Sequence, residues 1–212
     1  MIDGLILEFG VMDGMSMRQL CKRFPGRTVY GFDSFLGLRE KWCKHKAGEF
    51  ASSIPRKLPP NARLVIGWIE DTLPKFLKDH PANVAFVHVD IDTYSTAKFI
   101  LESIKERLIS KSVILFDEYW NYPGYENYEY RAWWEFVIAN PGIQVSQSPD
   151  HLDIIRRRFR DYPLGRLLHP ARVVRSLLRR LFNRQKPQMA FCIEREPCPS
   201  QPVSLCNSLK YD

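Results

Sequence analysis

The chain has 212 residues, of which 45% are hydrophobic and 26% charged, and its formal net charge is +7. This length suits one α/β domain with a substantial core and is too short for two ordinary domains. The five cysteines include no C-x-x-C pair, which argues against a zinc site or a disulfide framework. No signal sequence is recognisable and no apolar run reaches about 18 residues, so we expect a cytoplasmic protein.

The positive charge is concentrated in one segment. Residues 151–186 hold eleven basic and two acidic side chains, a net charge of +9, so the rest of the chain carries −2. We therefore predict a nearly neutral domain over 1–150 and 187–196, interrupted by a basic insertion over 151–186. Residues 197–212 are rich in proline and serine, lack periodicity, and are expected to form a flexible tail.

Short apolar runs alternate with longer amphipathic runs, which is typical of a mostly parallel sheet covered by helices on both faces. One helix is expected from about Ser16 to Phe24, and another from Thr93 to Leu108 with Asp92 or Thr93 as its N-cap. The predicted strands are Leu5–Glu8, Thr28–Phe32, Arg63–Ile66, Val84–Val89, Ser112–Phe116, Ile143–Val145 and Met189–Ile193.

The first predicted strand leads into a glycine turn, Gly10-x-x-x-Gly14. Such a turn lets a ligand approach the backbone, although an ordinary tight turn has the same pattern. Asp33 ends the next strand, about where nucleotide-binding units place a carboxylate on a ribose. The glycines do not fit the dinucleotide fingerprint, and Glu8 would repel a pyrophosphate but attract the ammonium group of S-adenosylmethionine. These residues favour a methyl donor over a dinucleotide.

Five motifs in order then resemble class I S-adenosylmethionine-dependent methyltransferases, most closely the macrocin O-methyltransferase branch. The resemblance covers about residues 4–147 and the last strand. It implies a Rossmann-like, doubly wound, seven-stranded α/β sheet, mostly parallel, with a final antiparallel strand. The motifs are Glu8 to Ser16, Val29 to Phe35, Gly67 to Pro74, Asp90 to Thr96 and Phe116 to Tyr119.

The same resemblance implies a cofactor site. Glu8, Gly10 and Gly14 would line the methionine and ribose side. Asp33 would hold the ribose hydroxyls, and Trp68 with Glu70 or Asp71 would flank the adenine. For Trp68, a core aromatic at a strand end is an open alternative. The implied cofactor-binding set is Glu8, Gly10, Gly14, Ser16, Asp33, Ser34, Trp68, Glu70 and Asp90.

Three acids match the positions where this branch holds a divalent cation: Asp90, Asp117 and Glu118. Hard oxygen ligands select Mg²⁺, which would acidify and orient a substrate hydroxyl. Carboxylates that converge at one sheet edge repel one another without a cation, so we favour the metal over helix capping for these three. For Asp92 we favour capping. Glu118 departs from the common Asp-Asp pair, which puts its direct coordination in doubt.

The catalytic candidates are Asp90, Asp117 and Tyr119, the last as a substrate contact or simply a packed ring. His88 lies in the middle of a strand and is expected to be a core histidine, so no general base is identified. The aromatic run 119–130 suits the face of a sugar or polyketide, with a surface loop as the alternative.

The expected function is Mg²⁺-dependent O-methylation of a sugar-containing or secondary-metabolite small molecule. Two alternatives stay open: RNA methylation through the arginine-rich insertion, and a catalytically impaired binding or scaffold protein. The amphipathic pattern from Pro170 to Phe182 fits an anionic membrane surface, a partner subunit, or a helix packed on its own domain. Nucleic acid is the less favoured partner, and peripheral membrane association and a homo-oligomer are open.

Overall fold

Seven strands form one sheet in a computed structural model, in the order β3-β2-β1-β4-β5-β7-β6. The structure describes residues 2–120, 122–147 and 188–195. β7 runs antiparallel to both of its neighbours, while the other described pairs are parallel. This confirms the Rossmann-like sheet with an antiparallel final strand. The strands are β1 (Leu5–Phe9), β2 (Val29–Asp33), β3 (Ala62–Ile66), β4 (Val84–Val89), β5 (Leu108–Phe116), β6 (Ile143–Gln147) and β7 (Met189–Arg195).

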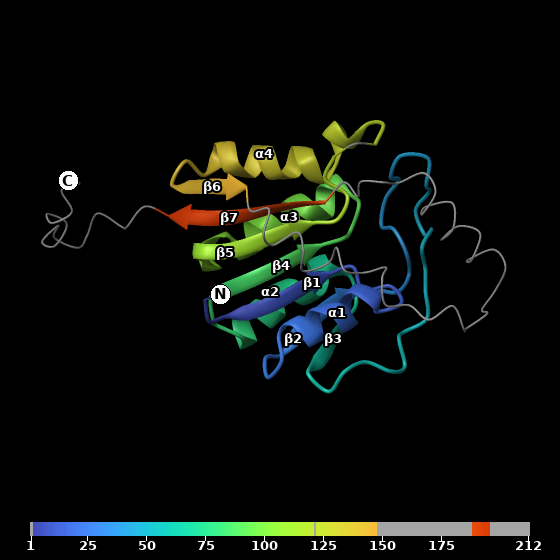
Figure 1. Cartoon of the computed structure of the whole chain (residues 1–212). Helices are drawn as coiled ribbons and strands as arrows, with labels where there is room; N and C mark the ends of the chain where they lie inside the picture. The colour runs from blue at the N-terminus through green and yellow to red at the C-terminus, as the bar shows by residue number, and fades with distance from the viewer. Residues whose placement is uncertain (1, 121, 148–187, 196–212) are drawn as a thin grey trace, which may run out of the picture.

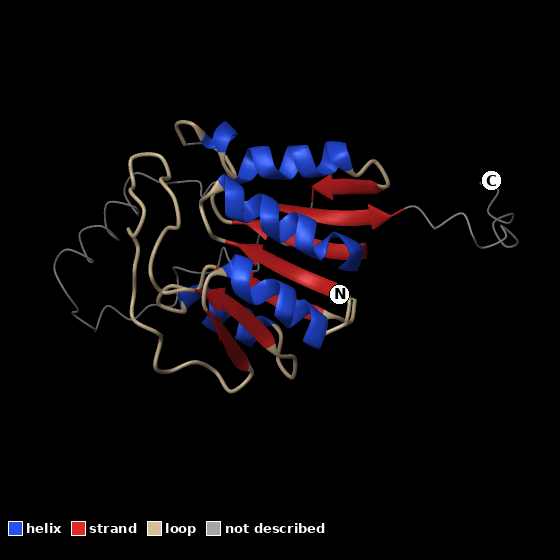
Figure 2. Ribbon diagram, turned by 180° about the vertical axis from the view of Figure 1, so that it is seen from behind, coloured by secondary structure: helices blue, strands red, loops and turns tan. Residues whose placement is uncertain are grey.

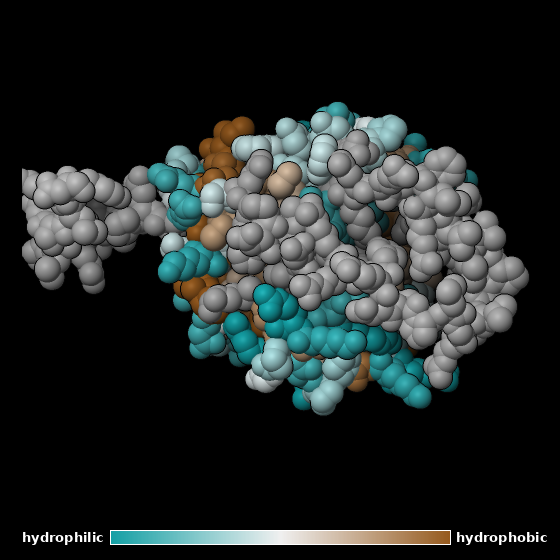
Figure 3. All heavy atoms as spheres, in the orientation of Figure 1, coloured by the Kyte–Doolittle hydropathy of each residue, from teal (hydrophilic) through white to brown (hydrophobic). Residues whose placement is uncertain are grey.

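Helices α2, α3 and α4 lie on one face of the sheet and α1 lies on the other (Figures 1 and 2). Every residue of β1 and β4 is buried, as expected for central strands covered on both faces. In the space-filling view, hydrophilic side chains gather over the α1 side of the molecule (Figure 3). The helices are α1 (Met15–Arg23), α2 (Ile69–Asp79), α3 (Tyr94–Ile104) and α4 (Glu129–Ala139), with short 3₁₀ turns η1 (Lys105–Arg107) and η2 (Tyr125–Asn127).

Aromatic rings form the core between the sheet and α4. Trp133 of α4 is fully buried against Phe116 of β5 and Phe191 of β7, with ring centroids 5.6 and 4.6 Å away. Buried aromatic rings remove a large apolar area from water, and neighbouring rings add about 0.5–1.5 kcal/mol beyond that burial. The packing fixes α4 on β5 and β7, so that its first residue lies near the carboxyl ends of the parallel strands.

The sheet order reverses between β1 and β4, because β2 follows β1 on one side and β4 flanks it on the other. In open α/β sheets, ligands bind in the crevice outside the carboxyl ends of the strands at such a switch point. The strand ends that meet here are Phe9, Asp33 and Val89. The fold therefore places the residues that follow these three strands at one site.

The predicted boundary between α3 and β5 is wrong on both sides. The helix expected to reach Leu108 ends at Ile104, and the strand expected from Ser112 begins at Leu108. The apolar spacing continues to Leu108 because that side chain is buried, but it is buried from a strand, where it pairs with Val84. Arg107 stabilises the change of direction by donating hydrogen bonds to the carbonyl oxygens of Leu77, His80 and Ala82.

Two predicted segments, the basic insertion 151–186 and the tail 197–212, lie outside the described residues. Their proposed roles stay predictions. Among the residues that the structure describes, no helix has the length and apolar character needed to cross a membrane.

Candidate functional site

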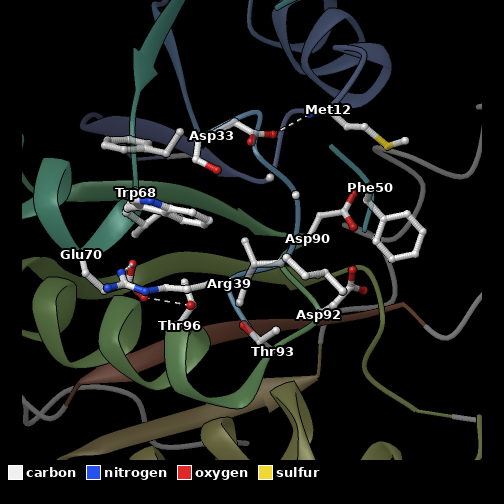
Figure 4. Close-up of a pocket in the computed structure, with 17 residues that line it drawn as sticks. Met12, Asp33, Arg39, Phe50, Trp68, Glu70, Asp90, Asp92, Thr93 and Thr96 are labelled. Carbon is white, nitrogen blue, oxygen red and sulfur yellow. Dashed lines mark hydrogen bonds and ion pairs between the residues drawn. The ribbon is translucent and has the colours of Figure 1, made fainter. Parts of the chain in front are cut away.

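A cleft opens at the switch point, with an empty volume of about 740 Å³ that includes its open mouth (Figure 4). Its walls come from the turns after β1, β2 and β4, from the starts of α2 and α3, and from the long segment between β2 and β3. The lining residues are Gly10, Met12, Phe32, Asp33, Ser34, Gly37, Leu38, Arg39, Phe50, Trp68, Ile69, Glu70, Asp90, Ile91, Asp92, Thr93 and Thr96.

The backbone geometry requires a glycine at position 10. A Cβ atom at this position would lie 1.9 Å from the carbonyl oxygen of Asp90, and the φ angle of Gly10 is 88°. Any other residue would therefore push the turn after β1 away from the turn after β4. Gly10 lines the cleft, and its lack of a side chain also allows the two loops that border the cleft to touch.

Asp33 binds three backbone amides. Its Oδ2 accepts hydrogen bonds from the N–H groups of Val11 (2.8 Å) and Met12 (2.7 Å), and its Oδ1 accepts one from Phe35 (2.7 Å). Each carboxylate oxygen can accept about two hydrogen bonds, so acceptor capacity remains for a ligand. Asp33 thus ties the β1 turn to the end of β2 and still faces the cleft (Figure 4).

The α2 end of the cleft holds a balanced pair of charges. Arg39 pairs with Glu70 at 2.5 Å, and its guanidinium lies 5.5 Å from the centre of the Trp68 ring. The other oxygen of Glu70 accepts a hydrogen bond from the Thr96 hydroxyl at 2.9 Å. Figure 4 shows these four side chains grouped at one side of the cleft. The indole face and the neighbouring polar groups suit a flat, uncharged ring.

The segment between β2 and β3 is fastened to two helical regions. Glu40 accepts hydrogen bonds from the hydroxyl (2.7 Å) and backbone N–H (3.3 Å) of Ser95, at the start of α3. The backbone N–H of Cys43 donates to the Tyr128 hydroxyl at 2.8 Å, next to α4. Because Arg39 and Phe50 of this segment line the cleft, these bonds hold one of its walls in place.

Acidic side chains gather at the β4 and β5 end. The carboxylate oxygens of Asp90 and Asp117 and a ring nitrogen of His88 all lie within 4.8 Å of one another. His88 is fully buried and pairs with Glu8 at 3.1 Å, while its Nε2 is 3.8 Å from Asp117. Burial alone lowers the pKa of His88, but the Asp117 and Glu8 carboxylates outweigh it and raise that pKa to about 9. A buried hydrogen bond also joins Gln188 to Asp117.

A further buried acid, Glu129, lies at the start of α4. Burial raises the pKa of Glu129 well above its usual range, and the charges of Asp92 and Asp90 raise it further. Its Oε1 accepts hydrogen bonds from the backbone N–H groups of Ile91 and Asp92. A residue of α4 therefore holds the turn after β4 in place through two hydrogen bonds.

Six of the nine predicted cofactor residues line the cleft, namely Gly10, Asp33, Ser34, Trp68, Glu70 and Asp90. The other three do not. Glu8 is paired with His88 inside the sheet, Gly14 is the N-cap of α1, and Ser16 is buried in α1. The roles of all nine in cofactor binding stay predictions.

Of the predicted metal and catalytic residues, the structure likewise brings some together and leaves others apart. Asp90 and Asp117 come together, but the third member of their group is His88, and Glu118 is not part of it. Tyr119 is 4% exposed and its ring contacts Phe116, Tyr130 and Phe191, which are contacts of a core residue. Glu118 as a ligand and Tyr119 as a catalytic group stay predictions.

Sequence reasoning missed Arg39, Phe50 and Thr96 of the cleft wall and Glu129 of α4, and it assigned Asp92 to helix capping. Thr96 follows Thr93 by three residues at the start of a predicted helix, a spacing that places both on one face. Arg39 and Phe50 lie in an irregular segment and had no comparable signal. Of the six non-glycine residues with positive φ in the described chain, three line the cleft: Met12, Phe50 and Asp92. Such strain is concentrated at functional sites.

Comparisons with known proteins agree with this fold. Residues 7–119 match the family described as methyltransferase domain. The calicheamicin methyltransferase CalS11 is 24% identical with a TM-score of 0.54, covering 70% of this chain and 69% of that one. The O-methyltransferase NovP is 21% identical with a TM-score of 0.49, covering 66% and 65%. An O-methyltransferase from Bacillus cereus is 17% identical with a TM-score of 0.45, covering 68% and 66%. No curated protein matches the chain.

Proposed function

The chain belongs to the methyltransferase domain family, and we propose that it is an S-adenosylmethionine-dependent O-methyltransferase that modifies a hydroxyl group of a small molecule. The observation that carries this proposal is the cleft at the switch point. It combines a carboxylate at the end of β2, an indole face, and two acids after β4, of which Asp90 also belongs to the cluster with His88 and Asp117.

The charges of the cleft suit a cationic donor. Its lining contains four acidic residues, Asp33, Glu70, Asp90 and Asp92, against one arginine, Arg39. S-adenosylmethionine carries a sulfonium and an ammonium group, which such a lining attracts, whereas the pyrophosphate of a dinucleotide would be repelled. We assign the ribose hydroxyls to Asp33, the adenine to the Trp68 side, and the methionine portion to the region of Gly10 and Asp90.

The acid cluster fits a divalent cation. Ligand atoms of His88, Asp90 and Asp117 converge within 4.8 Å of one another. Carboxylate oxygens suit Mg²⁺, so we assign the ligands to Asp90 and Asp117, with Glu118 as a further candidate. Such an ion lowers the pKa of a bound hydroxyl. In this assignment His88 is not a metal ligand. It keeps its pair with Glu8, and its other ring nitrogen stays next to the Asp117 carboxylate.

Asp92 is the candidate for the proton acceptor. It lines the cleft beside Asp90, and its φ of 65° is unusual for a residue with a side chain. The helix N-cap position is occupied by Thr93, so the geometry does not require Asp92 as a cap. We propose that the Asp92 carboxylate takes the proton of the acceptor hydroxyl. The hydroxyl oxygen then bonds to the methyl carbon, and the carbon–sulfur bond breaks to leave S-adenosylhomocysteine.

The acceptor class follows from the rings near the cleft. Phe50 lines it, and Trp42, Tyr122 and Tyr128 form a contacting group of rings behind Phe50. Aromatic faces with polar tips suit the mixed surface of a sugar ring, so we propose a hydroxylated glycoside or a related natural product as the acceptor.

The test is methyl transfer from labelled S-adenosylmethionine to a panel of hydroxylated glycosides, with and without EDTA. We expect product with at least one acceptor, its loss on chelation, and recovery on addition of Mg²⁺. The Asp90→Ala variant should be inactive, whereas Glu135→Gln, at a half-buried position of α4, should match the native protein. Turnover that survives both EDTA and Asp90→Ala would contradict the metal-assisted reaction.

A further inference from the structure

Glu129 is fully buried beside the turn that carries the acids of the cleft. Its Oε1 accepts hydrogen bonds from two consecutive backbone N–H groups, of Ile91 at 3.2 Å and of Asp92 at 3.1 Å. Its Oε2 has no hydrogen-bond partner among the described residues. Acids at the first position of a helix are usually solvated, so the burial of this one needs a reason.

Two backbone N–H groups of the turn after β4 need a hydrogen-bond acceptor where the Glu129 carboxyl lies. The N–H of Asp90 donates to the carbonyl oxygen of Phe9 at 2.9 Å, and that of Thr93 donates to the carbonyl oxygen of Ile91 at 2.7 Å. The N–H groups of Ile91 and Asp92 lie between these two, and both donate to Glu129. Without Glu129, two adjacent amides of a partly buried turn would lose their partner.

The conformation of Asp92 explains why the two amides converge. Asp92 has a φ of 65°, in the left-handed region. A left-handed residue in a turn directs successive N–H groups toward one point, where they form a small anion-binding concavity. The Glu129 carboxyl occupies that point, and the amino end of α4 adds favourable partial charge. The same interaction therefore holds the turn and its strained residue together.

We propose that Glu129 is a positioning residue, whose Oε1 fixes the Ile91–Asp92 turn and thereby directs the side chains of Asp90 and Asp92 into the cleft. Figure 4 shows both carboxylates on the cleft side of this turn. The inference rests on the proposed function for what these two acids do there. It requires an acceptor atom at the right distance rather than a negative charge, because two neutral N–H groups are the partners.

Two variants separate the reach of the acceptor oxygen from the presence of a carboxyl group. Glu129→Gln removes the carboxyl group and keeps an oxygen acceptor at the same distance. Glu129→Asp keeps the carboxyl group but shortens the side chain by one methylene, so the oxygen no longer reaches the amides. Glu135→Gln is the matched control, because Glu135 lies on the same helix, is half-buried, and contacts Tyr94, Lys98 and Arg131 rather than the turn after β4.

The readouts are hydrogen exchange of the Ile91 and Asp92 amides by NMR and the affinity for S-adenosylhomocysteine by calorimetry. With Glu129→Gln and Glu135→Gln we expect native exchange and an affinity within about threefold of the native value. With Glu129→Asp we expect exchange of these two amides to be about tenfold faster, the equivalent of one lost hydrogen bond, and weaker binding of S-adenosylhomocysteine.

Three results would overturn the proposal: native exchange in Glu129→Asp, fast exchange in Glu129→Gln, or a Gln variant that circular dichroism shows to be unfolded. The exchange rates do not depend on the cofactor. If the native protein does not bind S-adenosylhomocysteine, the proposed function fails, while exchange still decides whether Glu129 holds the turn.

Discussion

The two ends of the cleft balance their charges differently. At the β2 and α2 end, Asp33 is held by three backbone amides and Glu70 by Arg39 and Thr96. At the β4 and β5 end, Asp90, Asp92 and Asp117 lie near two buried acids, with the imidazole of His88 among them. At the first end, protein groups donate hydrogen bonds to both acids. At the second end, acidic side chains outnumber basic ones, and a bound cation would reduce this excess of negative charge.

This difference indicates that the two ends of the cleft have different roles in binding. A site whose acids already have protein donors is preorganised for an uncharged ligand such as a nucleoside. A site with excess negative charge binds positive groups and lowers the pKa of a hydroxyl once a metal is present. The predictions below test whether the two ends act independently.

The largest effect is expected at the acid end. Asp117→Asn removes a proposed metal ligand and should weaken Mn²⁺ binding by more than about 100-fold, since even indirect partners of a metal contribute 10–100-fold. Mn²⁺ binding can be measured by electron paramagnetic resonance. S-adenosylhomocysteine binding should stay within about threefold of native, because Asp117 does not line the cleft. If the variant keeps its Mn²⁺ affinity, Asp117 is not a ligand.

The next effect is expected at the other end. Asp33→Ala removes three hydrogen bonds to the loop and the proposed ribose contact. Hydrogen bonds to a charged group are worth about 1.5–3 kcal/mol, so affinity for S-adenosylhomocysteine should fall roughly 10- to 150-fold. Mn²⁺ affinity should be nearly unchanged. Calorimetry measures the first quantity, and equal losses of both ligands would show that the two ends are not independent.

Stability should respond to pH through Glu129. Its pKa is raised by burial and by Asp92 and Asp90, so the folded protein holds a proton that the unfolded chain releases above its ordinary pKa. Native stability therefore falls as pH rises above about 4.5 toward the folded-state pKa, by at most about 1.4 kcal/mol per pH unit. The Glu129→Gln variant has no carboxyl group at this position, so its stability does not fall with pH for this reason. Urea unfolding at several pH values should show the Gln variant gaining stability relative to native as pH rises, and a constant difference would contradict this.

The smallest effect is expected from Arg39→Ala. The Arg39 side chain is 46% exposed, and ion pairs of this kind contribute at most about 1 kcal/mol, so affinity for S-adenosylhomocysteine should fall by no more than about fivefold. Arg56→Ala is the matched control, because Arg56 is exposed on the same segment but does not line the cleft. A larger loss, or an equal loss in the control, would mean that the pair with Glu70 has another role.

Much of the fold and part of the site follow from local sequence patterns. Val84–Val89 is apolar at every position except His88, and the strand has the same bounds. Asp33, Asp90 and Asp117 could be placed at one edge because each ends or follows a strand, and parallel strands end together. These positions depend on strand order alone.

The rest depends on contacts between distant segments. Arg39 reaches Glu70 from a segment without regular structure, and Glu129 meets Ile91 across 38 residues. Tyr119 adjoins the acids in sequence but packs into the core, because its ring fits beside Phe116 and Phe191. Periodicity contains no information on which partner a side chain will meet in space.

The most direct test of the central claim is a calorimetric titration of S-adenosylhomocysteine into the native protein in the presence of EDTA. Because the β2 and α2 end is satisfied by protein groups alone, we predict binding of one molecule per chain, with an affinity that added Mg²⁺ changes by less than about threefold. Absence of binding, or binding only after Mg²⁺ is added, would contradict the account.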